Sequence, residues 1–472
     1  MIDDKVTSLK NIRQKNLPYM ITWILYYAWI GAFMTWWTAS PMTDRIYGTD
    51  SRVLLHSLLL FSSAVVVLFF KPPTFVKYSR IGAIVIVVNS LLFYITYMVN
   101  AAPIVHSVAT VILALSLGIV NISVFIPLCY VLNNTEKFYA IIGTNFLIVI
   151  LAVLQEINVI NEKVVFPISF AVLIGSIVPI YKFREEHYEE ERIRCEKHIP
   201  KKPKSIYFTI ALNMLYACFC KSGSRVFVTY ADNYTQSRLF VYYYIGGMAG
   251  CLVYYLIYKL FKKCNDVTWN VTFSTFVFAM VLYITYESEA MRALFSFIIG
   301  IGSTMGMINM YYILCVIAKK YWDQTYVKAS IMIIGLAGGL GGIALGKYFS
   351  ISNNITLAKV IMVSAILIVI VLMSFSSRLA VTYYRESWEE DSTMTEIDNC
   401  NRRKLVQYKL TEREIDVCNL LLENLSAKQI AVALDLTENT INSYKKTLYK
   451  KLDVTSKDEL VNKINEENRK RY

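Results

Sequence analysis

The residues best suited to binding chemistry lie near the end of the chain, in the stretch LTENTINSYKKTLYKKL at 436–452. Apolar residues recur there at helical spacing and place Ile441 and Leu448 on one face. The opposite face carries amides, hydroxyls and amines, on Asn439, Asn442, Ser443, Lys446, Thr447 and Lys450. Amides and hydroxyls can bond the edges of bases, and lysines can reach phosphates or guanine. This face is therefore a candidate reader of the DNA major groove, although a merely solvated face has a similar composition.

Four short helices are predicted to position that face, at 412–423, 427–434, 438–452 and 457–467. Three of them start with a capping box, in which a hydroxyl caps the third helical amide and a Glu or Gln reaches back. These boxes are Thr411 with Glu414, Ser426 with Gln429, and Ser456 with Glu459. The remaining helix starts with Thr437 and Glu438, a capping hydroxyl and an acid suited to the helix dipole.

The apolar residues of these helices predict one small core, made of Ile415, Cys418, Leu421, Leu422, Ile430, Ala431, Leu434, Ile441, Tyr444, Leu448, Leu452, Leu460, Val461 and Ile464. Only Asp-Leu-Thr joins the second and third helices. Such a short connection is typical of a helix-turn-helix.

Residues 410–461 resemble the LuxR-type helix-turn-helix family. The matching residues are Leu-Thr-Glu-Arg-Glu at 410–414, Ser-Ala-Lys-Gln-Ile-Ala at 426–431 with Leu434, Thr-Ile-Asn-Ser-Tyr at 440–444, and Lys-Leu-Asp-Val at 451–454. The chain departs from the family pattern at Asn424, where the family has Gly, and at Asn442, where it usually has Lys. The resemblance implies that the fourth helix contributes to dimerisation. It also implies a DNA surface at Lys428, Thr440, Asn442, Ser443, Lys446 and Lys450.

The remainder of the chain has the composition of a membrane protein. The 472 residues are 56% hydrophobic and only 18% charged, whereas a soluble protein is about 25% charged. Apolar runs of about 18 to 25 residues are long enough to cross a hydrocarbon core of about 30 Å as helices. Because the sequence CKSGSRVF interrupts the seventh run, eleven spans are the alternative to twelve. The twelve predicted spans are 18–39, 53–70, 80–99, 104–132, 137–155, 164–183, 205–228, 239–261, 268–287, 291–318, 326–349 and 355–376.

The distribution of Lys and Arg predicts the orientation of these spans. Loops on the side of the N-terminus hold about 22 basic residues before the last span, and loops on the other side about 8. Basic residues accumulate on the cytoplasmic side of a membrane. Twelve spans with both chain ends in the cytoplasm fit this bias.

The layout of the spans resembles the major facilitator superfamily. Six spans, a charged cytoplasmic loop at 182–204 and six further spans are arranged as in that family, whose halves pack around a central cavity. Transporters of the family usually carry a Gly-x-x-x-Asp-Arg-type motif between spans two and three. Here the segment reads KPPTFVKYSRIG, in which only Arg80 and Gly82 echo the motif.

Few polar residues fall inside the spans, and those few are the candidates for binding a ligand. Lys221 and Arg225 are four residues apart, so they share one face if the seventh span is continuous; if the span ends early, both lie at the outer surface. Further candidates are Asn121, Asn145, Asn213 and Asn309, although such amides often bond a neighbouring helix. Aromatic residues of the first span, Trp23, Tyr26, Trp29, Trp36 and Trp37, fit interface belts, but Tyr27 is too central for a belt.

Other chemistry finds little support in the sequence. The nine cysteines are scattered, which predicts no disulfide framework, and Cys195-Glu-Lys-His198 lacks the second half of a metal site. No constellation of nucleophile, base and metal stands out, and a phosphate-binding P-loop is missing from the sequence. We therefore expect neither an enzyme nor a bound cofactor or metal.

We expect an all-α protein with four parts: a cytoplasmic segment at 1–17, a twelve-span membrane sensor at 18–376, a cytoplasmic linker at 377–404 and a DNA-binding domain at 405–472. The expected function is transcription regulation from the bacterial inner membrane, with a small molecule bound by Lys221, Arg225, Asn121 and Tyr27. DNA, membrane lipid, that ligand and a second copy of the chain are the expected partners. The alternative is a transporter with a regulatory C-terminal domain.

Overall fold

The computed structural model describes residues 6–34, 51–99, 102–157, 162–196, 206–216, 239–261, 264–286 and 288–351, with single residues between them and parts of 360–371 and 408–463. The chain divides into two compact units, one at 4–389 and the other mainly at 390–472. The regular structure of the described residues is helical throughout.

The first half of the large unit begins with α1 (Leu17–Ala28), which continues into a π-helical segment at Trp29–Met34. The helices that follow are α4 (Ser51–Phe69), α5 (Phe75–Met98), α6 (Pro103–Tyr130), α7 (Asn134–Glu156) and α8 (Glu162–Ile177). A short 3-10 helix, η5 (Val178–Lys182), then leads to the polar helix α9 (Glu185–Glu196).

The second half contains α10 (Ile206–Tyr216), α12 (Leu239–Leu260), α13 (Cys264–Thr285), α14 (Glu289–Tyr321) and α15 (Gln324–Ile351). The residues described between 360 and 371 are helical as well. Each of the first eleven predicted spans therefore contains a described helix. Seven of the described helices are long and apolar enough to cross a membrane, so the large unit is a multi-pass membrane bundle.

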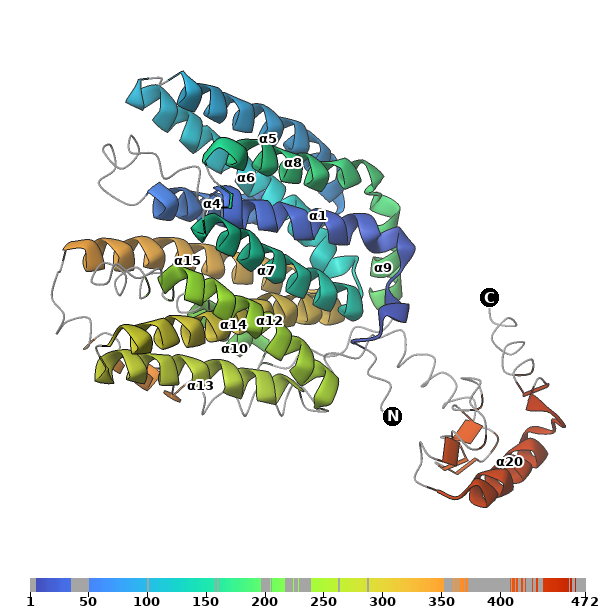
Figure 1. The fold of residues 1–472 in the computed structure, drawn as a ribbon. Coiled ribbons are helices and arrows are strands. Elements are labelled where there is room, and N and C mark those ends of the chain that lie inside the picture. The colour runs from blue at the N-terminus through green and yellow to red at the C-terminus, as the bar shows by residue number, and fades with distance from the viewer. Residues whose placement is uncertain are drawn as a thin grey trace. The chain divides into compact units, whose positions relative to one another are not determined.

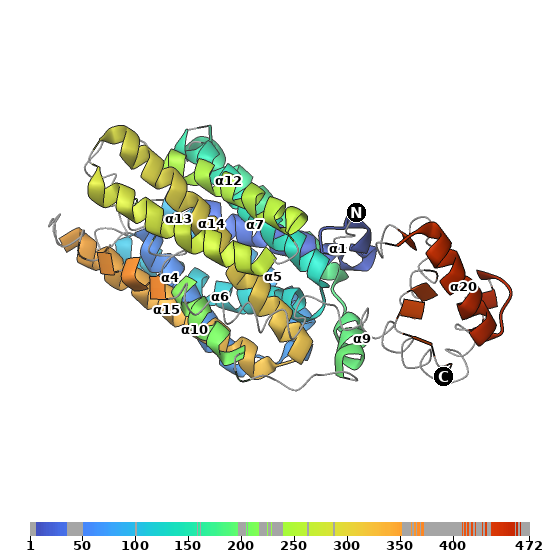
Figure 2. The ribbon, with the colours of Figure 1, turned by 90° about the horizontal axis from the view of Figure 1, so that it is seen from below.

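The two halves of this bundle pack side by side (Figures 1 and 2), with α5, α6 and α8 in one half and α12, α13 and α14 in the other. Helix α4 packs along α15 and thereby joins the halves. Helix α9 lies at the end of the bundle where α1 begins, in both views.

Small residues bring α12 and α14 into very close contact. A Cβ atom added at Gly246 would lie 2.0 Å from the carbonyl oxygen of Phe297, and one at Gly300 would lie 2.1 Å from that of Tyr243. Backbone therefore meets backbone on both sides of this contact, as in the small-residue interfaces of membrane helices. The glycines around Gly300 thus serve tight helix packing.

The aromatic residues of the first span correct the belt prediction. Trp23, Tyr26 and Trp29 are 1%, 1% and 4% exposed, and all three belong to the hydrophobic core. Trp29 also donates its Nε1–H to Ser169 Oγ at 2.9 Å. These rings line the interior of the bundle because α1 is a central helix. Trp36 and Trp37 lie outside the described residues.

The small unit is organised around α20 (Glu438–Leu452), whose bounds confirm the predicted third helix. Described residues at 413–421, 427–431 and 457–463 are helical at the predicted places. The buried residues Cys418, Leu421, Ile430, Ala431, Ile441, Leu448, Leu452 and Leu460 confirm the described part of the predicted core, and Leu410 and Val417 also belong to it. Ile415, Leu422, Leu434, Val461 and Ile464 lie outside the described residues.

Candidate DNA-binding face and central cavity

The polar face of α20 is held by caps at both of its ends. Thr437 Oγ1 accepts the amide of Thr440 at 3.2 Å, as the sequence predicted. The helix ends at Asp453, whose φ of 50° reverses the chain, a left-handed conformation that Asp tolerates better than most residues. Ile441, Leu448 and Leu452 fix the rotation of the helix because they are buried.

This rotation leaves the predicted DNA-contact residues of α20 accessible. Asn442, Ser443, Lys446 and Lys450 are exposed, and Thr440 is half-buried. They share one side of the helix, so amide, hydroxyl and amine groups form one continuous polar surface. Lys428 lies outside the described residues.

An ion pair between an exposed lysine and a buried glutamate ties α20 to the start of this unit. Lys451 Nζ donates to Glu414 Oε2 at 2.7 Å, and the Glu414 side chain is only 5% exposed. Thr411 completes the predicted capping box, because its amide donates to Glu414 at 2.7 Å and its hydroxyl accepts the Glu414 amide at 3.4 Å. Burial raises the pKa of the Glu414 carboxyl, but the hydrogen bonds from Lys451 and Thr411 outweigh it and hold the pKa below its ordinary value.

The last predicted capping box differs in one bond. Ser456 Oγ accepts the Glu459 amide at 3.1 Å, as expected. The Glu459 carboxylate, however, accepts the amide and hydroxyl of Thr455 at 2.6 and 2.8 Å. The carboxylate therefore binds Thr455, the residue before Ser456, because the amide and the hydroxyl of Thr455 both donate to the same carboxylate oxygen. The box at Ser426 and Gln429 lies outside the described residues.

The membrane unit encloses a central cavity of about 150 Å³. Helices α1, α6 and α7 of the first half and α12 and α14 of the second half all contribute to its wall. The lining includes Tyr27 and Asn121, which the sequence singled out. Its described residues carry no Asp, Glu, Lys, Arg or His, so the wall is aromatic, apolar and uncharged. Lys221 and Arg225 lie outside the described residues.

Asn121 presents an unused hydrogen-bond acceptor to this region. Its Nδ2 donates to Ser63 Oγ at 2.8 Å, and Ser63 in turn donates to the carbonyl of Leu59 at 2.8 Å. That chain fixes which way the amide points, because the Ser63 proton is already used. Asn121 Oδ1 is buried and has no hydrogen-bond partner among the described residues, and the same holds for Trp23 Nε1, on another residue of the cavity wall.

The other predicted amides have different roles. Asn145 lines the cavity but donates to the carbonyl of Ile141, one turn earlier in its own helix. Asn309 is fully buried and accepts the hydroxyl of Tyr254 on α12 at 3.2 Å, so it bonds a neighbouring helix. The side chain of Asn213 is not among those that the structure describes.

Sequence reasoning missed a cluster of hydroxyls on the cavity side of the second half. Tyr243 and Ser303, both of which line the cavity, place their hydroxyl oxygens 2.8 Å apart. Ser224 lies 3.0 Å from the Tyr243 hydroxyl and 3.1 Å from that of Ser303. Each residue type is common in membrane helices, so only the packing of α12 against α14 reveals the cluster.

A charged network closes the end of the bundle at which α1 begins, and the sequence did not reveal it either. Glu191 of α9 is 3% exposed. Its Oε1 accepts Arg13 at 2.7 Å and its Oε2 accepts Lys319 of α14 at 2.8 Å. Lys319 also donates to the carbonyl of Leu132 at 3.0 Å. The N-terminal segment, α9 and the second half are thereby joined through one carboxylate.

Glu136 extends this network into α7. It accepts the backbone amide of Arg13 at 2.8 Å and the side-chain amide of Asn16 at 2.7 Å. It also closes a capping box with Asn133 at the start of α7. The N-terminal segment is therefore fastened to α7 through Glu136 and to α9 through Glu191, and Glu191 in turn binds Lys319 of α14.

Comparison with known proteins separates the two units. Residues 408–464 match the family described as bacterial regulatory proteins, luxR family, so the small unit is a LuxR-type DNA-binding helix-turn-helix domain. A search of the curated proteins finds no match to the chain.

The membrane unit is similar in fold to transporters of the major facilitator type. The human organic anion transporter MFSD10 (TETRAN) aligns with a TM-score of 0.52 at 10% identity, over 80% of this chain and 100% of its own. A bacterial homologue of the iron transporter ferroportin, in an outward-facing state with soaked iron, aligns with a TM-score of 0.53 at 11% identity, over 78% and 100%. A variant of the E.coli fucose:proton symporter FucP aligns with a TM-score of 0.50 at 13% identity, over 77% and 99%. At such identities the likeness concerns the fold alone.

Proposed function

We propose that this protein is a membrane-bound transcription regulator, in which the membrane unit binds a small molecule and controls the LuxR-type domain. The exposed polar face of α20, inside a segment that matches DNA-binding regulators, is the observation that carries the proposal. Asn442, Ser443 and Thr440 would contact base edges, and Lys428, Lys446 and Lys450 would contact phosphates or guanine. The domain from Asn401 onward has 15 basic and 11 acidic residues, a small surplus for which a homodimer on DNA would compensate.

The ligand is proposed to bind in the central cavity. Unpaired buried polar atoms are costly, so Asn121 Oδ1 and Trp23 Nε1 favour a molecule that offers them a donor and an acceptor. Tyr27 adds an aromatic surface, and its ring lies 3.9 Å from that of Trp23 between centroids. Lys221 and Arg225 are proposed to add positive charge from the seventh span. Such a site, apolar with a few polar groups, is typical of small-molecule pockets.

Control is proposed to depend on the charged network around Glu191. A ligand changes the balance of two conformations only if it binds one of them more tightly. Both halves contribute to the cavity wall, and both are joined through Glu191 and Lys319 at the end of the bundle. Ligand binding that moves the halves would therefore break or strengthen this network. With both chain ends in the cytoplasm of a bacterial inner membrane, as the basic residues predict, the network would face the same compartment as the DNA-binding domain.

Chromatin immunoprecipitation of the tagged full-length protein tests the proposal, beside a variant with Lys446→Ala and Lys450→Ala. Discrete peaks that disappear in the variant are expected. Lys445→Ala is the control for the loss of one charge from α20 and is compared with Lys446→Ala alone, since the Lys445 amine lies 5.7 Å from the ring of Tyr449. Absence of peaks under every growth condition tested, with the protein present in the membrane, would contradict direct regulation.

Transport with a regulatory C-terminal domain is the second candidate function. The likeness to transporter folds favours it. Uptake of labelled solutes into vesicles containing the purified protein distinguishes the two. Concentrative uptake that survives removal of the α20 lysines would support a transporter.

A further inference from the structure

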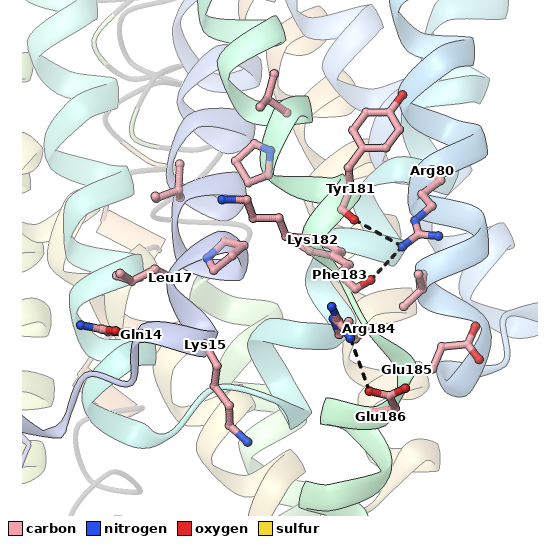
Figure 3. A pocket seen from close by; sticks show the side chains of 15 residues that line it. Gln14, Lys15, Leu17, Arg80, Tyr181, Lys182, Phe183, Arg184, Glu185 and Glu186 are labelled. Carbon is pink, nitrogen blue, oxygen red and sulfur yellow. Dashed lines mark hydrogen bonds and ion pairs between the residues drawn. The ribbon is translucent and has the colours of Figure 1, made fainter.

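A second hollow lies on the outside of the membrane unit, at the end of the bundle closed by the Glu191 network. It is an open groove of about 1130 Å³ between α1, α5, η5 and the start of α9. We call it the basic groove. Figure 3 shows Arg80 and Lys182 at one end of it, with Glu185 and Glu186 beyond Arg184 at the other end.

The positive charge at this end is not neutralised by neighbouring carboxylates. Arg80 donates one amino group to the carbonyl oxygens of Phe183 at 3.0 Å and Tyr181 at 3.4 Å. Its other donors are left for a further acceptor, because a guanidinium has five N–H groups. Among the described residues, neither Arg80 nor Lys182 has a carboxylate within ion-pair distance.

The other two basic residues of the groove are already paired with carboxylates. Lys15 Nζ lies 2.6 Å from the carboxylate of Glu190, and Arg184 lies 3.8 Å from that of Glu186. Glu185 also lines the groove and has no cationic partner among the described residues, so Arg80 and Lys182 leave the groove with one net positive charge. A purely structural role for Arg80, binding the carbonyls at the end of η5, explains one of its amino groups and does not explain Lys182.

The remaining wall of the groove is apolar and open to the surroundings of the bundle. Leu17, Ile21, Val178 and Tyr181 line it with exposed fractions of 40%, 42%, 59% and 61%. Val178 and Tyr181 belong to a stretch long and apolar enough to cross a membrane, and Leu17 and Ile21 lie at the start of the first predicted span, so their exposed carbon would face lipid. The groove thus combines two cations with an adjoining hydrocarbon surface.

We infer that the basic groove binds an anionic phospholipid, with the phosphodiester at Arg80 and Lys182 and the acyl chains along Ile21 and Val178. A basic pocket between membrane helices on the cytoplasmic side suits an anionic headgroup. Arginine suits a phosphate in particular because its planar donors match two oxygens. A free phosphate would use only the two cations and leave the apolar wall unused. This binding does not depend on the proposed regulatory function.

Native mass spectrometry of the full-length protein tests the inference. The protein is released from nanodiscs of equal phosphatidylglycerol and phosphatidylcholine content, and the retained lipids are counted. We expect several-fold more phosphatidylglycerol than phosphatidylcholine on the wild type. In the variant with Arg80→Gln and Lys182→Gln, we expect that preference to be lost, so that the two lipids are retained about equally, because each basic residue near an anionic surface contributes separately.

The control variant removes two other charges from the same end of the bundle, through Lys71→Gln and Lys77→Gln. Both lysines are exposed, and neither lines the groove. The control should keep the preference of the wild type. If the double variant does not fold, Lys182→Gln alone serves, since the Lys182 amine forms no ion pair with the described residues that would hold the fold together. For that single variant we expect a partial loss of preference, about threefold.

Three results would overturn the inference. One is equal retention of the two lipids by the wild type. Another is an equal loss of preference in the groove variant and the control, which would indicate general attraction to basic residues at the membrane surface. The third is displacement of the retained lipid by millimolar glycerol phosphate, which would mean that the two cations bind phosphate without any use of the acyl wall.

Discussion

Cys129 on α6 and Cys315 on α14 hold their sulfur atoms 3.4 Å apart, across the boundary between the two halves of the membrane unit. Both side chains are fully buried. Lys137 strengthens this boundary, because its amine donates to the backbone carbonyl of Cys315 at 2.9 Å. The pair therefore reports directly on whether the halves touch at this level.

A membrane-permeant oxidant is expected to join Cys129 and Cys315 in the full-length protein. Peptide mass spectrometry after digestion would identify the cross-linked pair. Cys251 is the control, since it is buried on α12 and no cysteine is described beside it. A molecule that separates the halves should slow the cross-linking. Cross-linking of Cys251 at the same rate would show that the chemistry is unselective.

Lys319→Met is expected to open the charged network. The substitution removes a cation that is paired with the buried Glu191, and removal of one partner of a buried ion pair costs about 3 to 5 kcal/mol. Hydrogen exchange in peptides covering 9–16 and 185–196 should become faster. Lys320→Met, which changes the neighbouring and less buried residue, should leave exchange there nearly unchanged. Equal exchange in the two variants would contradict a central role for Lys319.

Lys446→Ala is expected to weaken DNA binding evenly across sequences, because a lysine bound to phosphate carries no sequence information. The slope of log affinity against log salt should decrease by about 0.9 for each phosphate that is no longer neutralised. Asn442→Ala should instead leave the slope unchanged and relax the preference for one base pair. Fluorescence anisotropy with full-length protein in detergent measures both quantities. A change of slope in the Asn442 variant would indicate that Asn442 contacts the DNA phosphate backbone and not a base.

Glu414 makes the small unit sensitive to acid. Its pKa is lower in the folded than in the unfolded protein, so its contribution to stability is complete above the unfolded pKa, about 4.3. The contribution is lost as the pH falls through the lower folded pKa. The protection of α20 amides against hydrogen exchange, relative to the intrinsic exchange rate at each pH, should therefore fall below about pH 4. Glu414→Gln should weaken the unit at neutral pH and flatten the profile, whereas the exposed Glu438→Gln should keep the wild-type profile.

Asn121→Leu is expected to abolish regulation while the protein remains folded. Leucine has nearly the shape of asparagine, and it replaces an acceptor that has no partner among the described residues. Ser63 keeps its own bond to Leu59. Transcript levels of the genes found by immunoprecipitation, together with the melting temperature, provide the test. Normal regulation in this variant would remove Asn121 from the ligand site.

Periodic features of the sequence predicted the folded helices well. The third helix of the small unit begins after Thr437 and ends at Leu452, as predicted. Both ends could be predicted because capping and apolar spacing depend on residues only a few positions apart. For the same reason, Asn442 and Lys446 could be placed on an exposed face before any fold was known. Hydropathy likewise predicted the spans that the large unit contains.

Interactions between distant segments could not be predicted in this way. Glu191 meets Arg13 and Lys319, which lie far from it along the chain, and no local pattern marks such a meeting. Tyr27 and Asn121 were singled out as polar or aromatic residues deep in a span, a signal strong enough to place them at the cavity. Trp23 has the same chemistry near the end of the span, where an interface belt explained it equally well.

The close approach of backbones at Gly246 and Gly300 also limits how this gene can vary. Every single-base change in a glycine codon that alters the amino acid introduces a Cβ atom, and here that atom would overlap a carbonyl oxygen of the facing helix. No amino acid that a single-base change can introduce at these positions would avoid this overlap. Both positions should therefore remain glycine in any collection of functional mutants, whereas the lipid-facing residues around them should tolerate many substitutions.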